Sequence, residues 1–278
     1  MKPTSILLRP PKQLSSCIAA AIFRDTRGTC LTDVDRFNYF PATPLVSISL
    51  VIVGDLRLVH SIDNLIAARQ APPLPSLSIT ALQAQPMVSW SPGEVCALTV
   101  GFYPDAWVKL GASPSEGTMP EAVRAALRNF SSNPNPQSSW QAFCRSLLPI
   151  WEVKRNAGGI PDWPGSDRLA DWSRYLFNRV NTTAPGRSVR TLERRLRRWS
   201  GQSRQHLDHY AAIDELHRRT VKDSDTSLAG LATDSGFSDQ SHMGRAVLRS
   251  TGFSPARLNH LIKTEESFWC YRLLGDRF

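Results

Sequence analysis

A run of arginines between residues 187 and 222 is the part of this sequence whose residue types most directly suggest chemistry with a partner. The run holds ten Lys and Arg against four Asp and Glu, so it carries +6 of the chain's +9 formal charge. Clustered arginine on a helix is the electrostatic footprint expected for binding to a phosphate backbone. A solvated helix face explains the same charge equally well, so further signals are needed.

The arginines fall within a segment, residues 187–201, that has the pattern of an amphipathic helix. Ser188 can cap its start and Gly201 can end it. The predicted apolar stripe is Val189, Leu192, Leu196 and Trp199. This arrangement leaves four arginines largely on other faces, namely Arg190, Arg194, Arg197 and Arg198.

A second segment, residues 226–255, has the pattern of a helix-turn-helix. A short helix with Leu228, Leu231 and Ala232 turns at Gly236 into a second helix. The buried face of that second helix is predicted to hold Met243, Ala246 and Val247. Its outer face presents side chains suited to base edges and phosphates, namely Gln240, Ser241 and Arg245.

These two segments resemble the DNA-binding domain of the AraC/XylS transcription regulators. Gly236-Phe-Ser-Asp-Gln-Ser-His-Met-Gly-Arg-Ala-Val-Leu-Arg-Ser-Thr-Gly-Phe-Ser-Pro255 is similar to the carboxyl-terminal signature of that family. Ser188-Val-Arg-Thr-Leu-Glu-Arg-Arg-Leu196 resembles its first recognition helix. The resemblance covers about 168–262, and two half-signatures in the right order are far more specific than one motif.

The resemblance implies a seven-helix unit in which two helix-turn-helix motifs enter successive major grooves. A long helix over 204–222 would join them. Since 18 helical residues span roughly 27 Å, this helix and the helices packed at its two ends can place the recognition helices about one DNA turn apart. By family position, bases in the first groove would face Arg190, Glu193 and Arg194, and bases in the second would face Gln240, Ser241 and Arg245. Arg197 and Arg198 complete the predicted DNA-binding set.

The sequence departs from the family pattern in three places. Pro185-Gly186 would stop a regular helix just before the first recognition helix, so we expect an atypical first motif. Leu248 stands where a basic residue is common, which removes one expected phosphate contact. Glu193 would repel phosphate unless it accepts a hydrogen bond from cytosine N4.

The first half of the chain has a strand-like pattern. Alternating or short apolar runs at 45–53, 56–60, 77–81, 87–90 and 95–102 are separated by turn residues, which predicts a small antiparallel sheet or barrel. More loosely, three segments resemble the ligand-responsive domain of some AraC/XylS regulators: Leu8-Arg-Pro-Pro-Lys-Gln-Leu14, Phe37-Asn-Tyr-Phe-Pro-Ala-Thr-Pro44 and Gly101-Phe-Tyr-Pro-Asp-Ala-Trp107. That resemblance implies a cupin-like sheet domain. An effector pocket could be lined by aromatic residues that could equally be core, namely Tyr39, Phe40, Trp90, Phe102, Tyr103 and Trp107.

The fold class is therefore α+β, with an amino-terminal antiparallel β domain followed by an all-α domain. A helix is predicted at 120–130, and the polar segment 131–139 is the best linker candidate. We expect a sensing or dimerising domain at 1–137, a connector helix and linker at 138–165, the DNA-binding domain at 166–265, and a tail at 266–278.

Other chemistry has little support in the sequence. Five cysteines without a C-x-x-C pair are expected to be reduced thiols, and His206, His209 and His217 lack the partners of a metal site. Nucleophile-elbow, phosphate-loop and dinucleotide motifs are missing. We therefore expect no cofactor, no metal and no enzymatic activity. The longest apolar run is too short to span a membrane, and the apolar segment before Arg9 is too short for a secretory signal. We therefore expect a cytoplasmic protein.

The sequence thus predicts a regulator that binds double-stranded DNA under the control of an amino-terminal sensing domain. RNA polymerase, a small-molecule effector and a second copy of the chain are the further partners that this reading admits. The alternative is a cupin-like enzyme or small-molecule-binding protein whose basic region binds nucleic acid without sequence preference.

Overall fold

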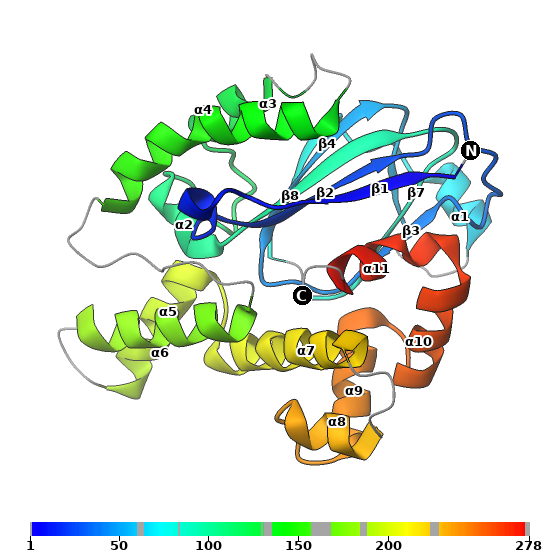
Figure 1. The fold of residues 1–278 in the computed structure, drawn as a ribbon. Coiled ribbons are helices and arrows are strands. Elements are labelled where there is room, and N and C mark those ends of the chain that lie inside the picture. Colours follow the sequence, from blue (N-terminus) through cyan, green and yellow to red (C-terminus); the bar gives the residue numbers. More distant parts are fainter. Residues whose placement is uncertain are drawn as a thin grey trace.

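The amino-terminal strands form two antiparallel sheets. The computed structural model describes residues 2–59, 64–82, 84–128, 130, 135–156, 168–183, 188–222 and 228–275. The larger sheet has the order β1 (Thr4–Leu8), β2 (Ile18–Asp25), β8 (Cys96–Phe102), β4 (Val46–Val53) and β6 (Leu77–Thr80). The smaller has the order β3 (Phe37–Phe40), β7 (Met87–Trp90) and β5 (Arg57–Val59). The predicted antiparallel sheet is confirmed (Figure 1).

The larger sheet separates two environments because side chains alternate along each strand. On β8, Leu98, Val100 and Phe102 are fully buried in the main core. That core is completed by α2 (Pro104–Lys109), α3 (Glu121–Arg128) and α4 (Pro136–Asn156). Thr99 and Gly101 point to the opposite face, which lines a cavity described below. Short helices η1 (Lys12–Leu14) and α1 (Leu65–Gln70) complete this half.

Helix α4 packs against the amino-terminal sheet. Its stripe of Trp140, Phe143, Leu147 and Trp151 is fully buried in the same core as Val100. The helix begins at Pro136, inside the segment 131–139 expected as a linker, and residues 131–134 lie outside the described part of the chain. The polar segment therefore connects two helices of one packed unit, because the buried tryptophans tie α4 to the sheet.

The carboxyl-terminal half is helical, as expected. It contains α5 (Leu169–Thr183), α6 (Val189–Ser200), α7 (Arg204–Lys222), α8 (Leu228–Asp234), α9 (Gln240–Thr251) and α10 (Pro255–Thr264). Between 168 and 264 the described residues thus form six helices, one fewer than the seven that the resemblance implies. The α5 helix ends before Pro185-Gly186, which lies in the undescribed segment 184–187. In Figure 1, α7 runs below the sheets and joins the α5–α6 pair to the α8–α9 pair.

The last described residues return to the amino-terminal sheets. The short helix η2 (Glu266–Phe268) and α11 (Trp269–Gly275) contact β3, and α11 also contacts β1 (Figure 1). Trp269, Cys270, Tyr271 and Leu273 are buried there. The segment expected as a tail is therefore a packed element as far as residue 275.

Two of the sequence-based exclusions can be compared with the structure. No helix among the described residues is long and apolar enough to cross a bilayer. All five cysteines are free thiols; Cys30 is exposed and the other four are buried. Burial raises the pKa of Cys96 to about 11 and that of Cys144 to about 12, so both are neutral core residues, as their positions predicted.

Candidate nucleic-acid interface and ligand cavity

Helix α6 begins and ends where the sequence predicted. The Ser188 hydroxyl oxygen accepts a hydrogen bond from the Thr191 backbone N–H at 3.3 Å, and Gly201 ends the helix with a left-handed φ of 68°. Leu196 is buried, but Val189 is 81% exposed, so its predicted place in the apolar stripe is wrong. The helix packs on its neighbours through its later turns, and the first turn extends beyond that contact.

The outer face of α6 carries positive charge that the chain does not neutralise. All four of its predicted DNA-binding arginines are exposed, and none has a hydrogen bond or ion pair among the described residues: Arg190, Arg194, Arg197 and Arg198. Elsewhere in the basic run, Arg218 and Arg219 both pair with Glu215. Glu193 lies half-buried on α6. Among the described side chains of the basic run, the free positive charge is therefore concentrated on α6.

Helix α9 has a buried face and an exposed face, as predicted. The Asp239 carboxylate accepts a hydrogen bond from the His242 backbone N–H at 2.7 Å and caps the helix; this bond lowers the pKa of Asp239. Met243, Ala246 and Val247 are buried. The predicted reading residues Gln240, Ser241 and Arg245 are all exposed. Leu248 is 52% exposed on the same helix.

The first motif is fixed to the amino-terminal half through Asp105 of α2. The Trp172 indole N–H of α5 donates to the Asp105 carboxylate at 2.9 Å, in a buried position. The Arg179 guanidinium lies 3.7 Å from the other carboxylate oxygen and 4.5 Å from the centre of the Trp199 ring on α6. This chain of contacts ties α6, through α5, to α2, which directly follows strand β8.

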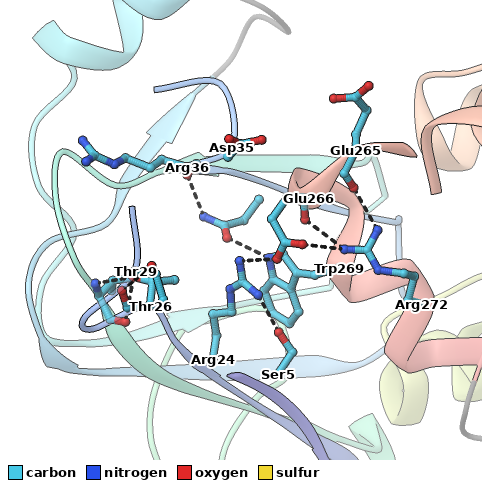
Figure 2. Close-up of polar contacts among 12 residues, drawn as sticks. Ser5, Arg24, Thr26, Thr29, Asp35, Arg36, Glu265, Glu266, Trp269 and Arg272 are labelled. Atoms are coloured by element: carbon cyan, nitrogen blue, oxygen red, sulfur yellow. Dashed lines mark hydrogen bonds and ion pairs between the residues drawn. The ribbon is translucent and has the colours of Figure 1, made fainter. Parts of the chain in front are cut away.

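The carboxyl-terminal segment, η2 with α11, is fixed to the amino-terminal sheets by a group of polar contacts (Figure 2). The Arg24 guanidinium on β2 lies 2.8 Å from the Glu266 carboxylate and 5.0 Å from the centre of the Trp269 ring. The Trp269 indole N–H donates to the side-chain oxygen of Asn38 at 2.8 Å. The Arg272 guanidinium donates to the Glu265 carbonyl at 2.8 Å and lies 3.2 Å from Glu266.

A cavity of about 570 Å³ lies between these two attachments. One wall is the face of the larger sheet opposite α4, and the other is formed by α7, α9, α10 and α11. A loop before β4 links this cavity to α9, since the Ala42 backbone N–H donates to the Ser250 carbonyl at 2.8 Å. The volume falls in the range typical of small-molecule sites. A ligand here would touch both halves of the protein.

Of the six predicted pocket residues, Phe40 lines this cavity. Phe102, Tyr103 and Trp107 are fully buried in the main core, and Tyr39 and Trp90 in a second core with the smaller sheet. Sequence reasoning missed the hydroxyl-bearing residues of the sheet wall because it looked for aromatic side chains. The alternation of serine with apolar residues in β4 was the available signal, since Ser47 and Ser49 both line the cavity.

Three titratable side chains on the helical wall are held in their neutral forms by burial. Burial lowers the pKa of His217 and raises that of Cys270 to about 12. Burial also raises the pKa of Tyr271. The Asp214 carboxylate on the same wall accepts a hydrogen bond from the Leu169 backbone N–H at 3.1 Å. No cluster of three potential metal ligands occurs among the described residues.

Comparisons with known proteins point to the helical half. A family model described as a helix-turn-helix domain matches residues 182–260, which include α6, α7, α8 and α9. A search of curated protein sequences finds no match.

Among solved structures, the chain is similar to ToxT from Vibrio cholerae O395, with a TM-score of 0.40 and 11% identity over 95% of this chain and 98% of ToxT. Unsaturated fatty acid-bound ToxT from V. cholerae strain SCE256 gives a TM-score of 0.37 and 11% identity over 94% of each chain. Both superpositions are loose, so the assignment of residues 182–260 rests on the sequence match.

Proposed function

We propose that this chain, a DNA-binding transcription regulator with an AraC-type helix-turn-helix domain at residues 182–260, reads two successive major grooves through α6 and α9. The observation that carries this proposal is the set of exposed, unpaired arginines on α6, together with the exposed polar face of α9. Helix α7 joins the two motifs; its 19 residues span roughly 28 Å. That length supports recognition helices about one DNA turn apart.

The exposed side chains divide by chemistry into two groups. We assign base contacts in the first groove to Arg190, Glu193 and Arg194, and in the second to Gln240, Ser241 and Arg245. Arginine matches the two acceptors of guanine and glutamine matches adenine. Arg197 and Arg198, further along α6, suit phosphate oxygens and would add affinity without sequence preference.

The amino-terminal half is proposed to sense a small molecule through the cavity. The predicted boundaries at 137, 165 and 265 remain proposals, and the packing of α4 and α11 on the sheets supports counting both helices with the sensing part. Because the cavity is bounded by α7 and α9, occupancy would bias how the two motifs are held. RNA polymerase and a second copy of the chain remain proposed partners. The proposed binding to DNA supports a cytoplasmic location.

The experiment is a titration of the full-length protein against a selected DNA site, followed by fluorescence anisotropy at several salt concentrations. Arg194→Ala and Arg245→Ala should each cost roughly 1–3 kcal/mol and relax specificity at one base position. Arg198→Ala should weaken all sequences nearly equally and reduce the salt slope by about 1. Arg145→Ala, which removes an exposed charge from α4, is the matched control and should change neither.

Two outcomes would contradict the assignment. Equal, sequence-independent losses for all three arginine variants would show nonspecific binding, which the basic-region alternative predicts. The atypical first motif also predicts that Arg190→Ala costs less than Arg245→Ala. The reverse order would show that the first motif dominates recognition.

A further inference from the structure

The sheet wall of the cavity is lined by hydroxyl groups arranged in two ranks. The strand register places Ser47 beside Thr80 and Gly101, and Ser49 beside Ser78 and Thr99. All of these residues line the cavity. The serines and threonines among them are half-buried, so their hydroxyls lie within reach of a molecule that occupies the cavity.

Most of these hydroxyls are not used by the protein itself. The Ser49 and Thr99 hydroxyl oxygens lie 3.1 Å apart and form one hydrogen bond. The hydroxyls of Ser47, Ser78 and Thr80 have no partner among the described residues. Three free hydroxyls therefore point to a ligand with hydrogen-bonding groups on the sheet side.

The helical wall of the cavity is mostly apolar. Tyr271 of α11 lines the cavity, is 3% exposed, and its hydroxyl has no hydrogen-bond partner among the described residues. Because that oxygen is enclosed by protein, it is the remainder of Tyr271 that borders the cavity. Around it the wall is apolar, with Ile213, Met243, Leu258 and other aliphatic side chains.

The cavity offers no positive charge to an anion. None of the described residues that line it is Lys or Arg, and the one carboxylate is Asp214. The His217 ring is held neutral by burial beside the Tyr271 backbone. A carboxylate ligand would lose its hydration without gaining a cation and would face Asp214, which makes its binding unfavourable.

Given the proposed sensing role of the cavity, we propose that its effector is an uncharged, mainly apolar molecule with hydroxyl, carbonyl or amide groups, and not a carboxylic acid. The polar groups of the ligand bond to the free hydroxyls of the sheet wall, while its apolar body packs on the helical wall.

The test uses three probes with the same twelve-carbon chain and different headgroup charge: 1-dodecanol, dodecanoate and dodecylammonium. Their affinities for the full-length protein are measured at neutral pH by displacement of Nile red, an uncharged fluorescent dye. We expect dodecanol to bind at least tenfold more tightly than either charged probe. Equal or tighter binding of dodecanoate, or of dodecylammonium, would overturn the proposed ligand class while leaving the cavity as a binding site.

Three variants locate the binding and separate the two proposals. Ser78→Ala should weaken dodecanol binding several-fold without lowering the melting temperature, because it removes only an unpartnered hydroxyl. Ser78→Lys should reverse the preference in favour of dodecanoate. Ser49→Trp should fill the cavity and abolish all binding; if all three probes fail to bind wild type, or bind Ser49→Trp equally well, the cavity is not the effector site and the sensing role falls with it.

Discussion

The ion pair between Arg24 and Glu266 holds the carboxyl-terminal segment against strand β2. A single substitution at Glu266 tests how much this contact stabilises the fold. Arg24 is 4% exposed, and burial lowers its pKa while the Glu266 carboxylate partly offsets that effect. Its guanidinium also donates to the Ser5 hydroxyl oxygen at 2.6 Å (Figure 2). Glu266→Ala would leave this cation buried without its counter-ion.

The size of the loss follows from the burial of the two partners. Removing one partner of a fully buried pair costs about 3–5 kcal/mol. The Glu266 side chain is 32% exposed, and solvent would partly screen the remaining cation, so roughly 2–3 kcal/mol is expected. Arg24→Met removes the charge and keeps the apolar stem over Trp269; it should cost about 1 kcal/mol.

The assay is urea denaturation of the full-length protein followed by tryptophan fluorescence. The double variant Arg24→Met/Glu266→Ala should be about 1–2 kcal/mol more stable than Glu266→Ala alone, because no buried charge is then left unpaired. If the double variant is the least stable of the three, or if Arg24→Met costs as much as Glu266→Ala, the reasoning from buried charge is wrong.

Three further changes test other parts of the fold. Trp172→Phe removes the indole donor to Asp105 and should lower the free energy of unfolding by about 1–3 kcal/mol in urea denaturation. An unchanged free energy of unfolding would show that this hydrogen bond does not stabilise the fold. Gly201→Ala places a side chain on a residue with a φ of 68° and should lower the free energy of unfolding by roughly 1–3 kcal/mol in the same assay. Gly244→Ala in α9, where the added atom meets open space, should raise it by up to about 1 kcal/mol. Burial lowers the pKa of His217 from 6.5, so near pH 6 the imidazole is protonated in the unfolded chain and neutral in the folded protein. Acid therefore favours unfolding, and the melting temperature should fall as the pH drops from 7.5 to 5.5. That fall should be smaller in His217→Gln, and an equal fall in both would remove His217 as its cause.

Local patterns predicted the helical half well because caps and periodic apolar residues act within a few residues of each other. The linking helix has the predicted bounds, Arg204–Lys222, and Ser188 caps α6 as expected. The exposed positions of Gln240 and Arg245 followed from the same periodicity. Val189 was misplaced because the period gives the face of a helix but not where its packing contact ends.

The cavity and the two attachments could not be predicted, because they depend on contacts between distant parts of the chain. Arg24 and Glu266 are far apart in sequence, and each reads alone as a surface charge. Aromatic residues such as Trp107 suggested a pocket but fill the core, whereas small residues such as Ser47 define the space. Which side of a strand faces a cavity becomes known only once the sheet register and its covering helices are fixed.

Selection of DNA sites from a random library by the full-length protein tests the central claim most directly. Two helix-turn-helix motifs on one rigid link predict a selected site with two conserved blocks centred about 10 base pairs apart. Repeating the selection with Arg245→Ala should relax conservation at one base position within one block and leave the other block unchanged. Recovery of unrelated sequences, bound with only a steep salt dependence, would contradict sequence-specific reading by α6 and α9.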